Sequence, residues 1–167
     1  MKIINYEAKY KKELAGLFDN FHNYMVAIHS DGVLKPFATQ DDVLSYVDKM
    51  INDSETMNGF IYLAMVDDKI AGFTQGIIQD HSKDDRYHLV ANPGSEGWIG
   101  ELYVEKNYRK RGIGRALFEK AKKHFETNGC RAARLYVLDN NKDAFKLYTN
   151  LGMKARNIEM DLKLSQG

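Results

Sequence analysis

Residues 108–115, with the sequence YRKRGIGR, combine a cluster of basic side chains with two glycines. A helical pattern begins inside this segment, and the first turn of a helix presents unpaired backbone N–H groups and a partial positive charge. Glycine lets such a backbone approach an anion because no Cβ stands in the way. The basic side chains around it are Arg109, Lys110, Arg111 and Arg115. This combination is typical of a diphosphate site.

Two large classes of diphosphate site are excluded by what surrounds the glycines. The phosphate loop of nucleoside triphosphatases needs a Lys-Ser or Lys-Thr pair after its last glycine, and none follows Gly112 or Gly114. A dinucleotide-binding turn needs a third glycine where this chain has Leu117. A solvated basic turn is the alternative for most charge clusters, and the two glycines favour a binding site over it.

Two further residues have side chains suited to proton transfer. Glu101 lies in an otherwise apolar stretch, and strand alternation places it on the opposite face from Leu102 and Val104. Its alternative role is a carboxylate that faces solvent or pairs with a lysine. Tyr148 shares one helix face with Asn141, and a phenol with a pKa of about 10 stays protonated at neutral pH. Its alternative role is a core tyrosine.

The elements that must position these residues follow from the spacing of apolar side chains. Repeats of three to four predict helices over residues 10–28, 39–51, 112–128 and 141–151. Alternating or β-branched runs predict strands over residues 2–5, 60–66, 70–79, 98–104, 134–138 and 158–164. Thr39 with Asp42 resembles a capping box for the second helix. Residues 67–69 indicate a hairpin turn and residues 80–97 a long loop.

Length and composition indicate a single domain over residues 1–167, and the mixture of predicted helices and strands makes it an α/β domain. Hydrophobic residues make up 44% and charged residues 28% of the chain, an average balance that predicts a folded protein. The net charge of +1 provides no global field for nucleic acid or an anionic membrane. Cys130 is the only cysteine, no Cys/His spacing indicates a metal site, and no stretch is apolar enough for a membrane span. We therefore expect a cytoplasmic protein that binds no metal, membrane or nucleic acid.

The glycine segment closely resembles the coenzyme A pyrophosphate signature of the GNAT superfamily of N-acetyltransferases, R-x-x-G-x-G. The signature residues in this chain are Arg109, Gly112 and Gly114. A second family pattern, N-x-x-A-x-x-x-Y-x-x-x-G, is similar to the segment with Asn141, Ala144, Tyr148 and Gly152. The two motifs stand in the family's order, within residues 98–154.

The resemblance implies a fold and a cofactor. The fold is a mixed, mostly antiparallel sheet of six or seven strands, with helices on both faces and a splayed parallel pair made by residues 98–104 and 134–138. The cofactor is acetyl-CoA, used as a co-substrate. Its diphosphate is expected on the N–H groups of Arg111, Gly112, Ile113 and Gly114. Its pantetheine arm is expected to pair like an extra strand with Leu102, Tyr103 and Val104.

The same resemblance suggests catalytic roles. Glu101 corresponds to a carboxylate that acts as general base or as the anchor of the amine, and Tyr148 to a general acid near the sulfur. Some relatives carry two adjacent acids on this strand, whereas this chain has Gly100 before Glu101, which argues against a two-acid mechanism. Asn141 is similar to a cofactor-binding asparagine, Asn140 beside it can do the same, and either can cap the helix.

The sequence thus predicts an N-acetyltransferase that moves an acetyl group from acetyl-CoA to a primary amine by direct attack in a ternary complex. The alternatives are a non-catalytic acyl-CoA sensor or interaction module of the same fold, and a nucleic-acid-binding domain, which the near-neutral charge disfavours. The acceptor is expected to be a small molecule, with a protein amine as the alternative. The oligomeric state is not determined by the sequence, and a homodimer is one option. A cationic acceptor such as a polyamine or aminoglycoside is favoured by Asp31, Asp80, Asp84 and Asp85.

Overall fold

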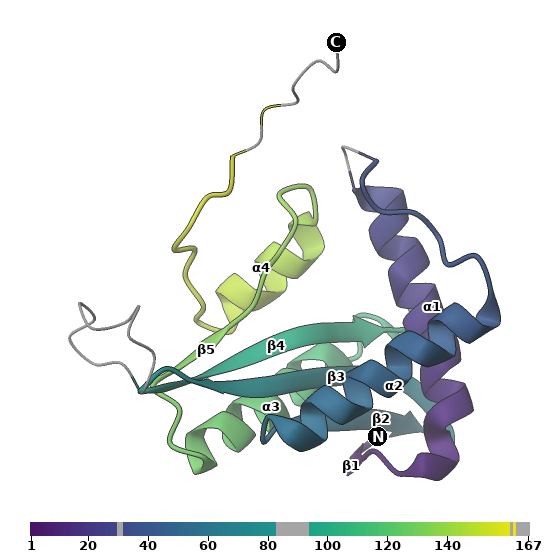
Figure 1. Ribbon diagram of the computed structural model, residues 1–167, viewed down its shortest axis with the longest axis horizontal. Coiled ribbons are helices and arrows are strands. Elements are labelled where there is room, and N and C mark those ends of the chain that lie inside the picture. The colour runs from purple at the N-terminus through teal and green to yellow at the C-terminus, as the bar shows by residue number, and fades with distance from the viewer. Residues whose placement is uncertain (30–31, 83–93, 161, 163–167) are drawn as a thin grey trace.

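A five-stranded sheet in the order β1-β2-β3-β4-β5 forms the centre of the computed structural model, which describes residues 1–29, 32–82, 94–160 and 162 (Figure 1). The strands are β1 (Lys2–Asn5), β2 (Phe60–Val66), β3 (Lys69–Asp80), β4 (Ser95–Val104) and β5 (Ala132–Arg134). Strands β1 to β4 are antiparallel to their neighbours, and β4 and β5 are parallel. The mixed, mostly antiparallel sheet with one parallel pair is confirmed, with five strands instead of six or seven in the described part of the chain.

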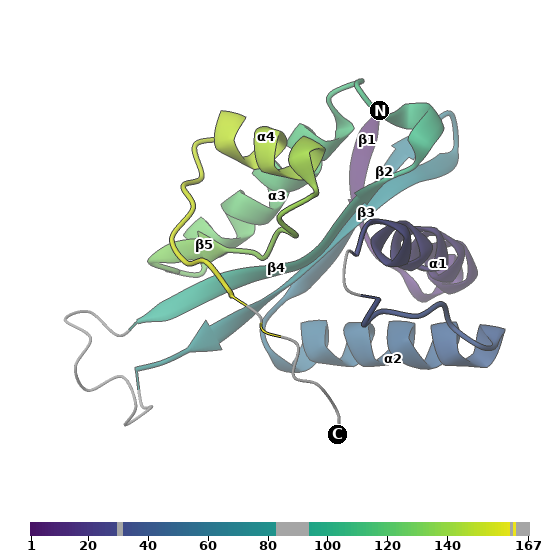
Figure 2. The same ribbon diagram turned by 90° about the horizontal axis from the view of Figure 1, so that it is seen from above.

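Helices cover both faces of this sheet, as predicted. Figure 2 shows α1 (Lys11–Ile28) and α2 (Gln40–Thr56) on one face. The opposite face carries α3 (Ile113–Thr127), with α4 (Lys142–Asn150) beside it. Two short 3-10 helices precede α1 and α3, namely η1 (Ala8–Tyr10) and η3 (Lys106–Tyr108). Among the described residues, none of the helices has the length and apolar character needed to traverse a bilayer.

Local sequence signals set the ends of α2 and of the β2–β3 hairpin. The Thr39 hydroxyl accepts a hydrogen bond from the Asp42 backbone N–H at 3.2 Å, and the Asp42 carboxylate accepts one from the Thr39 N–H at 2.9 Å. The predicted capping box is therefore confirmed. Asp67 and Asp68 have φ of 49° and 59°, the left-handed geometry of a two-residue hairpin turn. Lys69 already pairs with Val66, so the turn is one residue shorter than predicted.

Each face of the sheet has its own hydrophobic core. Phe73 and Tyr103 belong to the core under α1 and α2, together with Phe18 of α1. The core under α3 contains Phe125, and Gly97 of β4 leaves space for this ring, because a Cβ at that position would lie 2.2 Å from it. Side chains of β4 therefore reach two separate environments, and the face that each one takes determines what it can do.

Buried ion pairs join β5 to the start of β4. The Glu96 carboxylate is 3% exposed and accepts hydrogen bonds from Arg131 at 2.5 Å and from Arg134 at 2.6 Å. Burial alone would raise the pKa of Glu96, but the hydrogen bond and charge of Arg134, together with Arg131, bring this pKa below its usual value. These ion pairs stabilise the parallel pairing between residues 96–98 of β4 and residues 132–134 of β5.

The strand predicted over residues 134–138 is displaced to β5 (Ala132–Arg134), and the strand predicted over residues 158–164 is not observed among its described residues. Residues 135–138 are not in a strand, because the pairing between β4 and β5 ends where Trp98 meets Arg134. Their apolar character suits a strand, but a strand needs a partner, and β4 bulges just beyond Trp98. Of residues 158–164, the described residues 158–160 and 162 are not in a strand either. Ile158, Met160 and Leu162 alternate as a strand would, yet they are 80% to 90% exposed.

The predicted loop over residues 80–97 lies mostly outside the described residues. Asp80 ends β3, and residues 95–97 belong to β4. Of the acidic residues thought to favour a cationic acceptor, Asp31, Asp84 and Asp85 also lie outside the described residues.

Candidate active site

A β-bulge at Gly100 determines the direction of the Glu101 side chain. Gln75 of β3 pairs with Glu101 and the next residue, Gly76, pairs with Ile99, so Gly100 is the extra residue in β4. Ile99 packs in the core under α3, whereas Glu101 faces α2. Residues two apart in a regular strand share a face, so the bulge separates these two side chains. An isolated glycine inside a strand pattern is the sequence signal for such a bulge.

Glu101 borders a small cavity of about 50 Å³ between β4 and α2. Burial raises the pKa of Glu101 to about 7, and the nearby charge of Lys49 opposes this shift. The nearby Tyr46 hydroxyl also lowers the pKa of Glu101, by a smaller amount than burial raises it. Lys49 itself forms an ion pair with Asp53. Glu101 is therefore not a solvated surface acid, and it forms no ion pair with a lysine that the structure describes. At neutral pH both its ionised and its protonated forms are populated.

Among the described residues, no strand pairs with the edge of β4 beyond Trp98 on its β5 side. The two strands pair only over residues 96–98 and then separate, so the predicted splayed parallel pair is observed, though shorter than expected. Along this edge Leu102 and Val104 turn toward the α3 face, and Tyr103 turns toward the α1 face. The backbone between them is available to pair with an extended ligand, as an added strand would.

The glycine segment forms a tight turn that leads into α3. Gly112 is the N-cap of α3 with φ of 79°, and no side chain caps this helix end. Lys110 also has a positive φ, of 61°. Gly114 allows α4 to approach, since a Cβ there would lie 3.4 Å from the Leu147 side chain. Three basic side chains around the turn are exposed: Lys110, Arg111 and Arg115. The turn thus presents helix N–H groups and positive charge to solvent.

The Arg109 side chain connects this turn to β4 and α1. Its Nε donates a hydrogen bond to the Val104 carbonyl at 2.9 Å. Its guanidinium lies over the rings of Tyr24 and Tyr103, at 5.0 and 5.6 Å from their centroids. Part of the Arg109 side chain that was expected on the diphosphate is therefore engaged with the protein itself.

The two asparagines before α4 make contacts within the chain. The Asn141 side-chain oxygen caps α4 by accepting from the Ala144 N–H at 3.2 Å, and it also accepts from the Tyr24 hydroxyl at 3.3 Å. Asn140 donates to the carbonyl of Ile28 at the end of α1. The capping role considered for Asn141 is thus observed, and both residues link α4 to α1.

Tyr148 packs with the core under α3, at a ring-centroid distance of 6.0 Å from Phe118. Burial raises the pKa of Tyr148 to about 12, so the phenol stays protonated throughout the neutral range. Leu102 of β4 belongs to the same cluster. Tyr148 and Glu101 therefore lie on opposite faces of β4, with the free edge of this strand between them.

Residues of α2 near Glu101 were not predicted from the sequence. Tyr46, Lys49 and Asp53 recur on one side of α2, as on any amphipathic helix, and only the packing of α2 over the bulge brings them to Glu101. Within the described ranges, no group of three or more His, Cys, Asp or Glu side chains is arranged to hold a metal ion.

Comparison with known proteins agrees with this geometry. Residues 22–153 match the Acetyltransferase (GNAT) family. The chain is 30% identical over 120 residues to the mycothiol acetyltransferase of Catenulispora acidiphila, a match that covers 70% of this chain and 35% of that protein. The matched part spans between about a quarter and two thirds of the length of three other curated relatives.

Two solved structures share the fold over nearly the whole chain. A tetramutant of the BH1408 protein from Bacillus halodurans has a TM-score of 0.79 at 21% identity, covering 98% of this chain and 100% of that one. AAC(6')-Iy in complex with the bisubstrate analog CoA-S-monomethyl-acetylneamine has a TM-score of 0.69 at 14% identity, covering 99% and 98%. Since the family match includes the bulged strand, the glycine turn and α4, the chain belongs to the GNAT family of acetyltransferases.

Proposed function

We propose that this protein is an N-acetyltransferase that moves the acetyl group of acetyl-CoA to a primary amine by direct attack in a ternary complex. The observation that carries this proposal is the unpaired edge of β4, which runs between Glu101 on one face and Tyr148 on the other. A base and a hydrogen-bond donor on either side of a backbone ladder suit a thioester that lies along that ladder. A cytoplasmic location belongs to the same proposal.

The residues present fit acetyl-CoA as a substrate. The diphosphate would be held by the N–H groups of residues 111–114, where Gly112 provides the backbone geometry and no side chain caps the helix. The exposed Lys110, Arg111 and Arg115 would add positive charge around it. The pantetheine arm would pair with the backbone of residues 102–104.

Glu101 would act on the acceptor amine. The acceptor ammonium gives a proton to Glu101, and its nitrogen then attacks the thioester carbonyl carbon. A pKa of about 7 suits this base, because the ionised form is populated at neutral pH and still binds a proton. A backbone N–H of β4 would stabilise the oxyanion. As the carbon–sulfur bond breaks, the nitrogen loses its second proton to solvent and the amide leaves with the acetyl group. The coenzyme A thiolate takes a proton from solvent and leaves as the thiol.

Tyr148 would stabilise the departing sulfur by a hydrogen bond. Its pKa of about 12 lies well above the value of about 8.5 for an ordinary cysteine thiol, so complete proton transfer from Tyr148 to the thiolate would be uphill by roughly 5 kcal/mol. A hydrogen bond to the developing negative charge carries no such cost. We therefore assign Tyr148 as a donor that keeps its proton, a more limited role than the general acid implied by the family resemblance.

A primary amine is the acceptor that the cavity beside Glu101 favours. A volume of about 50 Å³ accommodates an ammonium end, while the rest of the acceptor has to lie outside, near the exposed Tyr46 and Lys49. A small molecule with a slender aminoalkyl arm meets this requirement, and so does a lysine side chain of a protein.

The test is a coenzyme A release assay with acetyl-CoA and a panel of diamines, amino acids, aminoglycosides and peptides. Turnover that depends on an amine, and that falls in Glu101→Gln while the affinity for acetyl-CoA is retained, supports the proposal. Binding of acetyl-CoA by calorimetry without turnover on any amine would instead assign the chain as a non-catalytic acyl-CoA module.

A further inference from the structure

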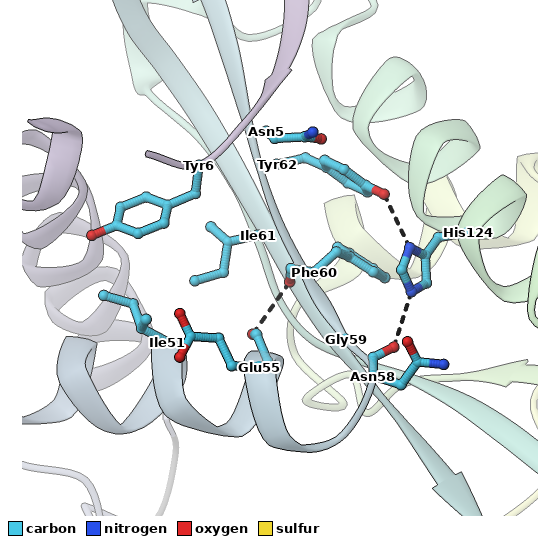
Figure 3. Close-up of a pocket in the computed structure, with 11 residues that line it drawn as sticks. Asn5, Tyr6, Ile51, Glu55, Asn58, Gly59, Phe60, Ile61, Tyr62 and His124 are labelled. Atoms are coloured by element: carbon cyan, nitrogen blue, oxygen red, sulfur yellow. Dashed lines mark hydrogen bonds between the residues drawn. The ribbon is translucent and has the colours of Figure 1, made fainter. Parts of the chain in front are cut away.

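A second cavity, of about 430 Å³, lies on the β1–β2 side of the sheet. Its wall touches the neighbourhood of the candidate active site through Ser54, which accepts a hydrogen bond from Gln75 of the cavity beside Glu101. The second cavity lies where the pairing of β1 with β2 ends at Asn5 and Tyr62, next to the buried Phe60 and Ile61 at the start of β2. Figure 3 shows its side chains, which come from β1, β2, the end of α2 and α3. None of the residues assigned to acetyl transfer lines it. Its volume falls within the range of small-molecule sites.

The walls of this cavity are mainly apolar. Ile51 of α2 and Ile61 of β2 line one part of it, together with the ring of Tyr6 (Figure 3). Phe60 and His124 line another part, with their ring centroids 4.9 Å apart. Aromatic and branched aliphatic walls of this kind favour a ligand with an apolar body.

His124 is held in place and has no ring nitrogen left for a ligand. Its Nε2 is 3.0 Å from the Asn58 carbonyl oxygen, and because a carbonyl only accepts, Nε2 must carry the hydrogen. Its Nδ1 then accepts from the Tyr62 hydroxyl at 3.1 Å. The imidazole therefore serves as a rigid wall, and the polar recognition has to come from another residue.

Glu55 is the charged side chain at this cavity. It is the only carboxylate that lines the cavity, and Figure 3 shows it beside Ile51 and Ile61. It forms no ion pair with any residue that the structure describes, and the nearby Lys11 is bound to Asp48 at 2.6 Å. A carboxylate without a counterion at the rim of an apolar cavity is complementary to an organic cation.

We propose that this cavity is a binding site for an organic ammonium ion with an aromatic or aliphatic body. The ammonium group pairs with Glu55, and the body lies against Ile51, Ile61 and Phe60. The site is separate from the acceptor position at Glu101, so it holds whether or not the proposed acetyl transfer does.

The experiment is an NMR titration of the ¹⁵N-labelled protein with 2-phenylethylammonium, and with 3-phenylpropionate as an anion of similar shape. The amine is expected to shift the backbone amide signals of Ile51, Glu55, Gly59 and Ile61 in a saturable way. The anion is expected to leave them unchanged. Equal shifts with both compounds, or no saturable shift with the amine, would overturn the proposal.

Variants identify the residue responsible for the binding. Glu55→Gln keeps the size of the side chain and removes its charge. It is expected to lower the affinity for 2-phenylethylammonium by about tenfold. Glu119→Gln, on the exposed side of α3, is the matched control and should change nothing. Glu101→Gln should leave these shifts unaltered, which distinguishes this cavity from the acceptor position. An unchanged affinity in Glu55→Gln would refute the assignment.

Discussion

The side-chain oxygen of Gln75 lies 2.5 Å from the position that a β-carbon on Gly100 would occupy. Gly100→Ala therefore forces Gln75 or the bulge to move, and it is expected to lower the free energy of unfolding by about 1–3 kcal/mol. Because Gln75 also borders the cavity beside Glu101, the KM for the acceptor should rise. Chemical denaturation and steady-state kinetics measure the two effects.

Two further variants isolate the collision at Gly100. Gly16→Ala, inside α1, has no neighbouring atom within 4 Å of the new carbon, so it is expected to stabilise the protein by about 0.5–1 kcal/mol. Gln75→Ala removes the colliding oxygen, so Gly100→Ala should cost less in that background. An equal cost in both backgrounds would mean that Gln75 does not restrict this position.

The glycine turn can be tested with a matched pair at the two ends of α3. Gly112 and Gly129 have φ of 79° and 69°, and neither has an atom within 4 Å of an added β-carbon. Valine at either position should cost about 1–2 kcal/mol of stability, since both backbones are left-handed. Only Gly112→Val is expected to weaken the binding of coenzyme A, by about tenfold or more, as measured by calorimetry. Similar affinities in the two variants would move the diphosphate away from this turn.

Removal of the Tyr148 hydroxyl tests its role at the sulfur. Tyr148→Phe keeps the ring that packs on Phe118 and loses a hydrogen bond to a charged atom, which is worth about 1.5–3 kcal/mol. The expected result is a kcat lower by about 10- to 100-fold with an unchanged affinity for coenzyme A. Tyr10→Phe, in the other core, serves as the control. A kcat within about threefold of the parent would leave Tyr148 as a packing residue.

Glu101 should make stability depend on pH. Its pKa is raised from 4.5 to about 7, so the folded state binds the proton more tightly than the unfolded state. The contribution of Glu101 to the free energy of unfolding is therefore full below about pH 4.5 and lost as the pH rises to about 7, by at most roughly 3 kcal/mol. Glu101→Gln lacks this loss and should gain stability relative to the parent between pH 5 and pH 8.

Denaturation of both proteins across this pH range measures that difference. Glu119→Gln should show no such trend, because this side chain is exposed on α3. A gap between Glu101→Gln and the parent that stays constant with pH would contradict the burial of the Glu101 carboxylate.

Local signals made much of this fold predictable. The Thr39 cap, the Asp67–Asp68 turn and the glycine that opens α3 each act through their own backbone or through neighbours a few residues away. Residues 135–138 and 158–164 have the composition of strands, but strand formation depends on a distant partner, which local pattern does not reveal. The parallel pairing is restricted by the Glu96 ion pairs and by the bulge in β4, both of which are tertiary features.

The parts of the candidate site that belong to a sequence motif could be predicted. The parts that depend on how distant elements pack together could not. Glu101, Tyr148 and the glycine turn were named from the sequence, and Glu101 and Tyr148 lie on opposite faces of β4. Their roles in binding and catalysis stay predictions. Gly100 carried a readable signal for the bulge. Tyr46, Lys49 and the cavity beside Glu101 carried none, because they depend on the angle at which α2 crosses the sheet.

The partial burial of α4 has a consequence for the proposed binding of acetyl-CoA. None of the residues of α4 is fully buried, whereas α3 buries Leu117 and Phe118 among others. A short helix held by partly buried side chains and by the bond between Tyr24 and Asn141 opens at a lower free energy than the sheet. Amide hydrogens of α4 should therefore exchange with deuterium before those of α3. The measured affinity for acetyl-CoA then includes the cost of closing α4, so a substitution that only stabilises this helix should tighten binding without adding a contact.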